Sequence, residues 1–128
     1  MQPIQQPNPT ELPLFVFGTL RRGQSNHHLL AGRYLRVLPA RLFDFARTEP
    51  LMIARHSGAV VDGEIYFLRP ATYEQTLRGC DALEGIPAGG TDGPCYRRLR
   101  VPVESAAGRH VAWAYADPST PDVPIPSW

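Results

Sequence analysis

The sequence predicts an α+β domain in which a mixed, curled sheet of about six strands packs against two helices. Apolar runs of strand length alternate with Gly and Pro, and two segments carry helix signals. The chain has 128 residues, of which 43% are hydrophobic, so it suits one sizeable core and does not require a second. We expect a domain at residues 14–117 between proline-rich tails at 1–13 and 118–128, because closely spaced prolines sustain neither helix nor sheet.

The first predicted elements are a strand, a tight turn and a short helix. The strand is apolar Leu14–Phe17, and Gly18 lets the chain turn sharply. Ser25 is a suitable N-cap for a helix over Asn26–Ala31, which Gly32 ends. Amides after such a turn lack helical acceptors and favour anions, so the junction predicts an anion-binding site. An ordinary strand–turn–helix connection is the alternative.

The middle of the chain is predicted to be mostly sheet. Apolar residues predict extended structure over Tyr34–Phe45, interrupted at Pro39, and a short strand over Leu51–Ala54. A longer strand follows at Val60–Leu68, where Gly63 marks a bulge.

The last third is predicted to hold one helix and a hairpin. Pro70 suits the first turn of a helix that ends at Gly85, with apolar residues three and four apart on one face. The Gly- and Pro-rich segment 86–94 is a loop. Strands over Tyr96–Val103 and Arg109–Ala116 follow, joined by a short turn.

Composition excludes several classes of function. The net charge is +1, so the chain lacks the excess of positive charge that binding to nucleic acid or to an anionic membrane requires. No apolar run approaches the roughly 20 residues of a membrane span, and no export signal begins the chain, so we expect a cytoplasmic protein with Cys80 and Cys95 reduced. The four histidines lack metal-ligand spacing, and we expect no metal and no cofactor.

Glu84 is the candidate for chemistry. It ends the predicted helix, where the helix dipole disfavours negative charge and raises the pKa of a carboxyl group above about 4.3. The alternatives are a solvated carboxylate at the helix end or an ion-pair partner of Arg97 or Arg98. We expect Asp81 on the helix surface and Glu64 on the solvent side of its strand.

The turn after the first strand has two further interpretations. The spacing of its glycines is close to that of a phosphate-binding loop. Gln24 stands where that loop needs lysine, and this argues against nucleotide hydrolysis. Arg21 and Arg22 either steer an anionic substrate or form a solvated basic turn.

Four segments in this order resemble the γ-glutamylcyclotransferase-like family, most closely its short branch of γ-glutamylamine cyclotransferases and AIG2-like proteins. The segments are Phe17–His27, Val61–Tyr66, Asp81–Gly85 and Tyr96–Arg98, and the resemblance covers about Leu14–Ala116. It implies a small mixed β-barrel with flanking helices. Two departures affect the expected pocket: Phe17 stands where the family commonly has Tyr, and residues 88–94 form a glycine-rich insert.

The resemblance also implies a reaction and its residues. A γ-glutamyl amine or peptide, the small-molecule partner, would be cyclised to 5-oxoproline with release of the free amine. The loop Phe17, Gly18, Thr19 and Leu20 would hold the substrate, and Glu84 would be the general acid/base. Tyr96 either closes the pocket or only packs. The alternative is a non-catalytic module of the same fold that binds a small ligand or a partner. The oligomeric state stays open.

Overall fold

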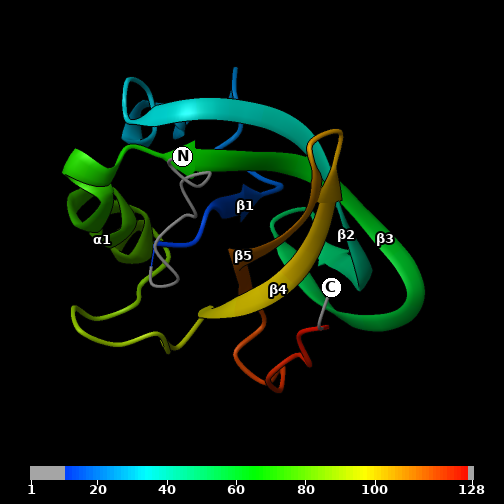
Figure 1. The fold of residues 1–128 in the computed structure, drawn as a ribbon. Coiled ribbons are helices and arrows are strands. Elements are labelled where there is room, and N and C mark those ends of the chain that lie inside the picture. The colour runs from blue at the N-terminus through cyan, green and yellow to red at the C-terminus, as the bar shows by residue number, and fades with distance from the viewer. Residues whose placement is uncertain (1–10, 127–128) are drawn as a thin grey trace.

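The computed structural model describes residues 11–126, and within them five strands close into a barrel in the order β1-β3-β2-β4-β5 (Figure 1). The strands are β1 (Leu14–Val16), β2 (Tyr34–Glu49), β3 (Met52–Leu68), β4 (Arg97–Ser105) and β5 (Gly108–Ala116). The helical elements are the 3₁₀ turns η1 (His27–Leu29) and η2 (Pro70–Thr72) and the helix α1 (Tyr73–Leu83). The predicted α+β barrel is confirmed.

Strands β2 and β3 form one long antiparallel hairpin, where shorter strands were predicted. The expected interruption at Pro39 is wrong, because Pro39 pairs with Glu64 inside β2. Pairing between β2 and β4 begins only at Ala40, so Pro39 lies where one side of β2 has no partner strand, a position that tolerates proline. The predicted strands at 51–54 and 60–68 are parts of the single strand β3.

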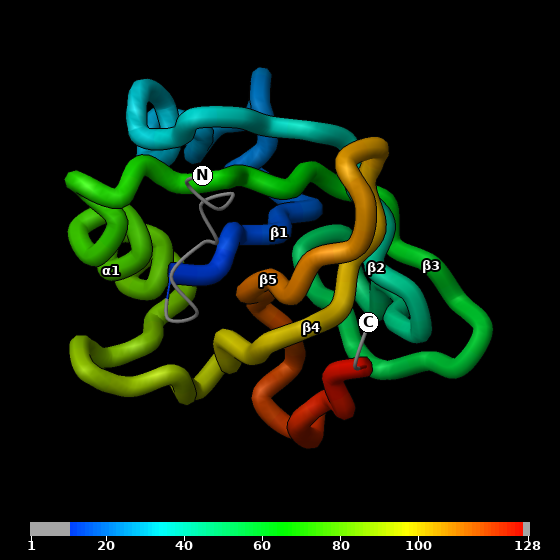
Figure 2. The backbone as a smooth tube through the Cα atoms, viewed as in Figure 1, coloured from blue at the N-terminus to red at the C-terminus, as the bar shows by residue number. Residues whose placement is uncertain are grey.

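A bulge at Asp44 curls this hairpin back towards the barrel (Figure 2). The register shifts between Phe43 and Phe45, and Asp44 adopts a positive φ of 65°. Its carboxylate Oδ1 accepts a hydrogen bond from the Gly58 amide at 3.0 Å. A bulge increases local twist and bends the strand that carries it. The hairpin tip therefore returns to β1, where Leu51 lies against the segment that follows that strand.

Gly63 permits a close approach of β1 and does not form the predicted bulge. It pairs in register with Ala40. A Cβ at this position would lie 2.3 Å from the carbonyl oxygen of Val16 and 2.7 Å from the ring of Phe15. Only glycine leaves room for the end of β1 to lie this close to its antiparallel neighbour β3.

Of the two predicted helices, only the second forms an α-helix in the described residues. The helix expected over 26–31 is only the 3₁₀ turn η1, and Ser25 does not cap it, although Gly32 ends the segment with a φ of 75° as predicted. Helix α1 forms as expected after Pro70 and packs on one side of the barrel (Figure 1). Its buried residues, among them Leu77 and Cys80, join Leu14 and Tyr66 in a core between helix and barrel, separate from the core inside the barrel.

The segment that follows β5, residues 117–126, lies on the barrel. The guanidinium of Arg97 donates to the carbonyl oxygen of Thr120 and to Oδ1 of Asp122, both at 2.6 Å. Residues 1–10 of the predicted N-terminal tail and 127–128 of the C-terminal tail lie outside the described residues.

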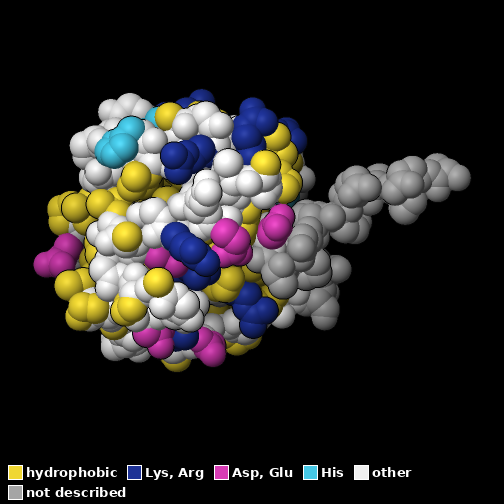
Figure 3. Space-filling model, turned by 90° about the vertical axis from the view of Figure 1, so that its left-hand side faces the viewer, with side chains coloured by type: hydrophobic (Ala, Val, Ile, Leu, Met, Phe, Trp, Pro, Cys, Tyr) yellow, Lys and Arg dark blue, Asp and Glu magenta, His cyan; other side chains and the backbone are white. Residues whose placement is uncertain are grey.

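Basic and acidic side chains are interspersed on the face shown in Figure 3. Between residues 11 and 126, no helix has the length and apolar character needed to cross a membrane.

Candidate active site

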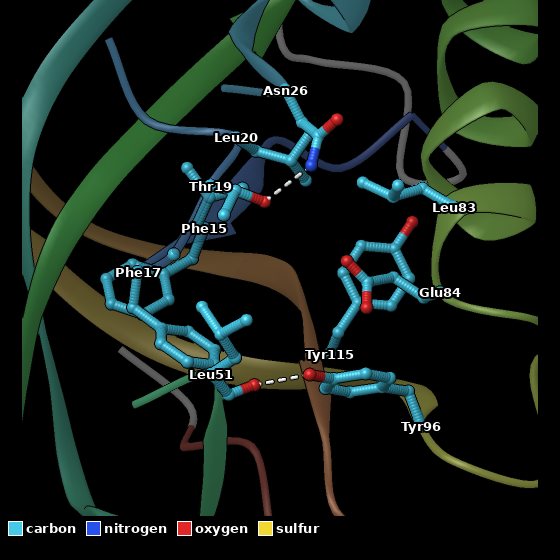
Figure 4. A pocket seen from close by; sticks show the side chains of 12 residues that line it. Phe15, Phe17, Thr19, Leu20, Asn26, Leu51, Leu83, Glu84, Tyr96 and Tyr115 are labelled. Atoms are coloured by element: carbon cyan, nitrogen blue, oxygen red, sulfur yellow. Dashed lines mark hydrogen bonds between the residues drawn. The ribbon is translucent and has the colours of Figure 1, made fainter. Parts of the chain in front are cut away.

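A cavity of about 270 Å³ opens between the end of α1, the segment after β1 and the tip of the β2–β3 hairpin (Figure 4). The closed barrel brings together residues that are far apart in the chain. The lining residues are Phe15, Val16, Phe17, Gly18, Thr19, Leu20, Asn26, Leu51, Leu83, Glu84, Tyr96 and Tyr115. All six residues proposed from the sequence as site residues therefore lie at one cavity.

The segment 17–20, here called the substrate loop after the role predicted for it, is held by hydrogen bonds to its carbonyl groups and to Thr19 Oγ1. The amide of Asn26 donates to the carbonyl oxygen of Thr19 at 2.9 Å, and the Asn26 side chain donates to Thr19 Oγ1 at 2.9 Å. Among residues 11–126, the amides of Gly18, Thr19 and Leu20 donate no hydrogen bond. Three consecutive amides without acceptors at the edge of a cavity suit an anionic oxygen.

Glu84 directly follows α1, and its carboxyl group points into the cavity towards the substrate loop (Figure 4). Gly85, with a φ of 76°, turns the chain away from the helix end. Burial raises the pKa of Glu84 to about 7. The direction agrees with the expectation from the sequence, and the cause is desolvation of the carboxyl group.

The alternative in which Glu84 is the ion-pair partner of Arg97 or Arg98 is wrong. Arg98 forms its ion pair with Asp81, and Arg97 pairs with Asp92 and Asp122. Within the described residues, Glu84 has no ion-pair partner. A carboxyl group that is desolvated and without a partner can exchange a proton near neutral pH.

Asp81 is buried, so its predicted place on the helix surface is wrong. Its Oδ1 accepts hydrogen bonds from Arg98 Nε at 2.9 Å and from the Tyr115 hydroxyl at 2.6 Å. Burial and the contact with Asp81 raise the pKa of Tyr115. Because Arg98 lies on β4 and Tyr115 on β5, Asp81 ties the last turn of α1 to the barrel one turn before Glu84.

Glu64 is also more enclosed than predicted, with a side chain that is 15% exposed. Its carboxylate accepts from the Arg22 amide and Nε, both at 3.0 Å, and from the Tyr66 hydroxyl at 2.8 Å. Burial alone raises the pKa of Glu64, but these hydrogen bonds outweigh it and the net pKa is lowered. Arg22 is thus an exposed turn residue, as one of the two alternatives had it, and its ion pair holds it against Glu64 of β3.

Tyr96 lines the cavity and donates its hydroxyl to the carbonyl oxygen of Leu51 (Figure 4). It therefore connects the start of β4 to the hairpin tip. Sequence reasoning did not identify Leu51, Asn26, Leu83 or Tyr115 as cavity residues. Leu51 carries no local signal, because its position depends on the curl of the hairpin at Asp44.

Comparison with known proteins identifies similar sequences. Residues 14–127 match the family model described as "Gamma-glutamyl cyclotransferase, AIG2-like". The gamma-L-glutamyl-butirosin B gamma-glutamyl cyclotransferase of Niallia circulans is 29% identical over 106 residues, which cover 80% of this chain and 64% of that protein. The gamma-glutamylaminecyclotransferase of Homo sapiens is 34% identical over 87 residues, which cover 59% of this chain and 54% of that protein. The matches thus span less than two thirds of either relative.

Solved structures share the fold. YkqA from Bacillus subtilis superposes with a TM-score of 0.65 at 24% identity, covering 88% of this chain and 37% of that one. At3g28950.1 from Arabidopsis thaliana gives a TM-score of 0.63 at 17% identity, covering 93% of this chain and 69% of that one. Since the family model matches residues 14–127 of the 128-residue chain, the chain belongs to the AIG2-like gamma-glutamyl cyclotransferase family.

Proposed function

We propose that this protein is a γ-glutamyl cyclotransferase that converts a γ-glutamyl amine or peptide to 5-oxoproline and the free amine, with Glu84 as general acid/base. The observation that carries the proposal is the desolvated Glu84 carboxyl group, with its pKa of about 7, directed at the substrate loop across a small cavity. The names of the two similar proteins and the family match support the reaction class.

The proposed reaction needs positioning and one proton carrier. The α-amine of the substrate attacks its own γ-carbonyl carbon, a carbon–nitrogen bond closes the five-membered ring, and the bond from the γ-carbon to the leaving amine breaks. The cavity would hold the substrate folded, so that both reacting groups already lie close together. One carbon–nitrogen bond forms and one breaks, so the reaction needs no oxidant, reductant or second substrate.

Glu84 would make both proton transfers. Its carboxylate accepts a proton from the α-ammonium group, which frees the nitrogen lone pair for attack. The resulting carboxylic acid then delivers the proton to the departing amine. A carboxyl group with a pKa near 7 suits both steps, because both of its protonation states are well populated at neutral pH.

The substrate loop would supply the stabilising charges. The amides of Gly18, Thr19 and Leu20 are available for the substrate carboxylate or for the oxyanion that develops on the γ-carbonyl oxygen. Apolar walls from Phe17, Leu51 and other lining residues would limit access of water to the reacting atoms.

The test is 5-oxoproline release from a panel of γ-glutamyl amines and peptides by the wild type and by Glu84→Gln. The variant keeps the shape of the side chain but cannot carry the proton, so we expect turnover to fall at least about a hundredfold. Glu74→Gln, at an exposed position on the same helix, is the matched control and should keep wild-type turnover. Turnover retained by Glu84→Gln would remove Glu84 from the mechanism, and no release from any compound would favour a non-catalytic binding module.

A further inference from the structure

Arg47, which lies on β2 near the hairpin tip and does not line the cavity, is bonded to the substrate loop. Its Nη2 donates to the carbonyl oxygen of Phe17 at 2.7 Å, and its Nη1 donates to the carbonyl oxygen of Pro50 at 2.7 Å. The guanidinium also lies over the Phe17 ring, 5.1 Å from its centroid. One side chain thus joins the hairpin tip to the first residue of the substrate loop.

The hydrogen bond to Phe17 determines the direction of the next amide. A trans peptide is planar, and its C=O and N–H point to opposite sides. With the Phe17 carbonyl directed at Arg47, the Gly18 N–H must point away from Arg47. Gly18 lines the cavity, and no acceptor for its N–H is present among residues 11–126.

The following peptides of the loop are held in the same way. The carbonyl oxygen of Gly18 accepts from the amide and the Nε of Arg21, each at 3.1 Å, and that of Thr19 accepts from the amide of Asn26. Each bond leaves the amide of the next residue on the other side of its peptide. Arg47 is the one donor in this set that comes from outside the segment 18–26.

Arg47 and Arg21 also bring positive charge to the carbonyl side of the loop. Burial lowers the pKa of Arg47, and the charge of nearby Arg21 lowers it further. Both guanidinium groups are nevertheless charged at neutral pH, because arginine does not lose its proton in proteins. A charged donor on a carbonyl oxygen polarises the peptide and strengthens the N–H at its other end.

We propose that Arg47 is a positioning residue of the site: it orients and polarises the Phe17–Gly18 peptide so that the Gly18 amide binds an anionic oxygen of the substrate. This proposal rests on the proposed function for the identity of the substrate, but the orientation of the amide can be tested without turnover. Because Arg47 also holds Pro50, it couples the hairpin tip, with Leu51 against Gly18, to the same loop.

The test follows the amide signals of residues 18–20 by ¹⁵N–¹H NMR during titration with two probes, acetate and 5-oxoproline. The proteins are the wild type, Arg47→Met and Arg47→Lys. Lysine keeps the charge but lacks the fork that reaches two carbonyl oxygens. The matched control is Arg55→Met on the other strand of the hairpin, where the guanidinium lies 5.7 Å from the Phe45 ring centroid.

We expect both probes to shift the signals of residues 18–20 in the wild type. Arg47→Met should weaken probe binding about tenfold or more, Arg47→Lys should lie between, and Arg55→Met should stay within about twofold of the wild type. In turnover assays, Arg47→Met should raise KM and also lower kcat, since the same amide contacts the substrate and the charge that develops on it. The unfolding midpoint of each variant shows whether the fold is kept, and Arg47→Lys decides the matter if methionine disrupts it.

Each outcome separates this proposal from the proposed function. Probe binding in Arg47→Met within twofold of the wild type overturns the role of Arg47, even when turnover depends on Glu84. Wild-type amides that respond to neither probe overturn it as well. Probe binding that depends on Arg47, with no turnover of any γ-glutamyl compound, supports the role of Arg47 and contradicts the proposed catalysis.

Discussion

At the scale of single residues, three carboxyl groups near the substrate loop and α1 lie in different environments. Asp81 accepts from Arg98 and Tyr115, and Glu64 accepts from Arg22 and Tyr66. These two carboxylates are neutralised by arginine. Among residues 11–126 no cation pairs with Glu84, and burial raises its pKa to about 7 while the pKa of Glu64 is lowered. The two paired carboxylates hold structural contacts, and the environment of Glu84 makes it the candidate for the proposed proton transfer.

The raised pKa of Glu84 predicts how activity depends on pH. Glu84 must be a carboxylate to accept the proton of the α-ammonium group, so kcat/KM should rise with pH and level off above about 7. Well below that value we expect about a tenfold loss for each pH unit, because the deprotonated fraction falls by that factor. The measurement is initial-rate 5-oxoproline release between pH 5 and 8.5. A flat profile over this range would contradict the assignment.

At the scale of elements, the end of α1 is fixed to the barrel by one buried ion pair. The Asp81–Arg98 contact lies one helical turn before Glu84, and Tyr115 joins it from β5. The helix end itself is partly open, since Leu83 is 40% exposed. The buried contact and the packing of Cys80 and Ile86 in the core together hold this last turn, from which Glu84 reaches the cavity.

Loss of this contact should lower both stability and turnover. Asp81→Ala leaves Arg98 buried without its partner, and we expect the free energy of unfolding to fall by about 3 kcal/mol. We also expect kcat to fall, because the last turn of α1 loses its anchor, whereas Glu74→Ala on the exposed side should change little. Urea denaturation and 5-oxoproline release check the two effects. A variant of normal kcat would show that α1 is positioned by other contacts.

Elements with local signals could be predicted from the sequence, and those that depend on distant contacts could not. The β4–β5 hairpin and α1 follow from apolar spacing and a proline start, and Glu84 and the substrate loop follow from the motifs. The curl of the β2–β3 hairpin depends on the backbone of Asp44 and its bond to Gly58. The burial of Asp81 depends on partners 17 and 34 residues later in the chain. No local sequence pattern predicts the bond between Asp44 and Gly58 or the contacts of Asp81.

At the scale of the whole molecule, the barrel places a charged group where the fold alone would not favour it. The core of the barrel and the core under α1 are apolar, and the cavity lies where β1, the hairpin tip and the end of α1 meet. Desolvation of Glu84 at this place disfavours its charged form, so the native state is less stable with a carboxylate there than with a neutral side chain. The desolvation on which the proposed proton transfer depends thus opposes stability at neutral pH.

The pH dependence of stability tests this conflict directly. The pKa of Glu84 is about 7 in the folded protein against 4.5 as its ordinary value, so its contribution to stability is full below about pH 4.5 and is lost as pH rises through 7. Glu84→Gln stays neutral and should be more stable than the wild type at pH 8 by about 1–2 kcal/mol, a value below full conversion of the shift because the carboxyl group is partly exposed. At pH 4.5 the two proteins should differ little. Urea denaturation at both pH values, with Glu74→Gln as control, measures the difference. The prediction is contradicted if Glu84→Gln and the wild type differ in stability by the same amount at pH 4.5 and at pH 8. The carboxyl group would then not be desolvated, and the low-dielectric site on which the proposed proton transfers depend would be absent.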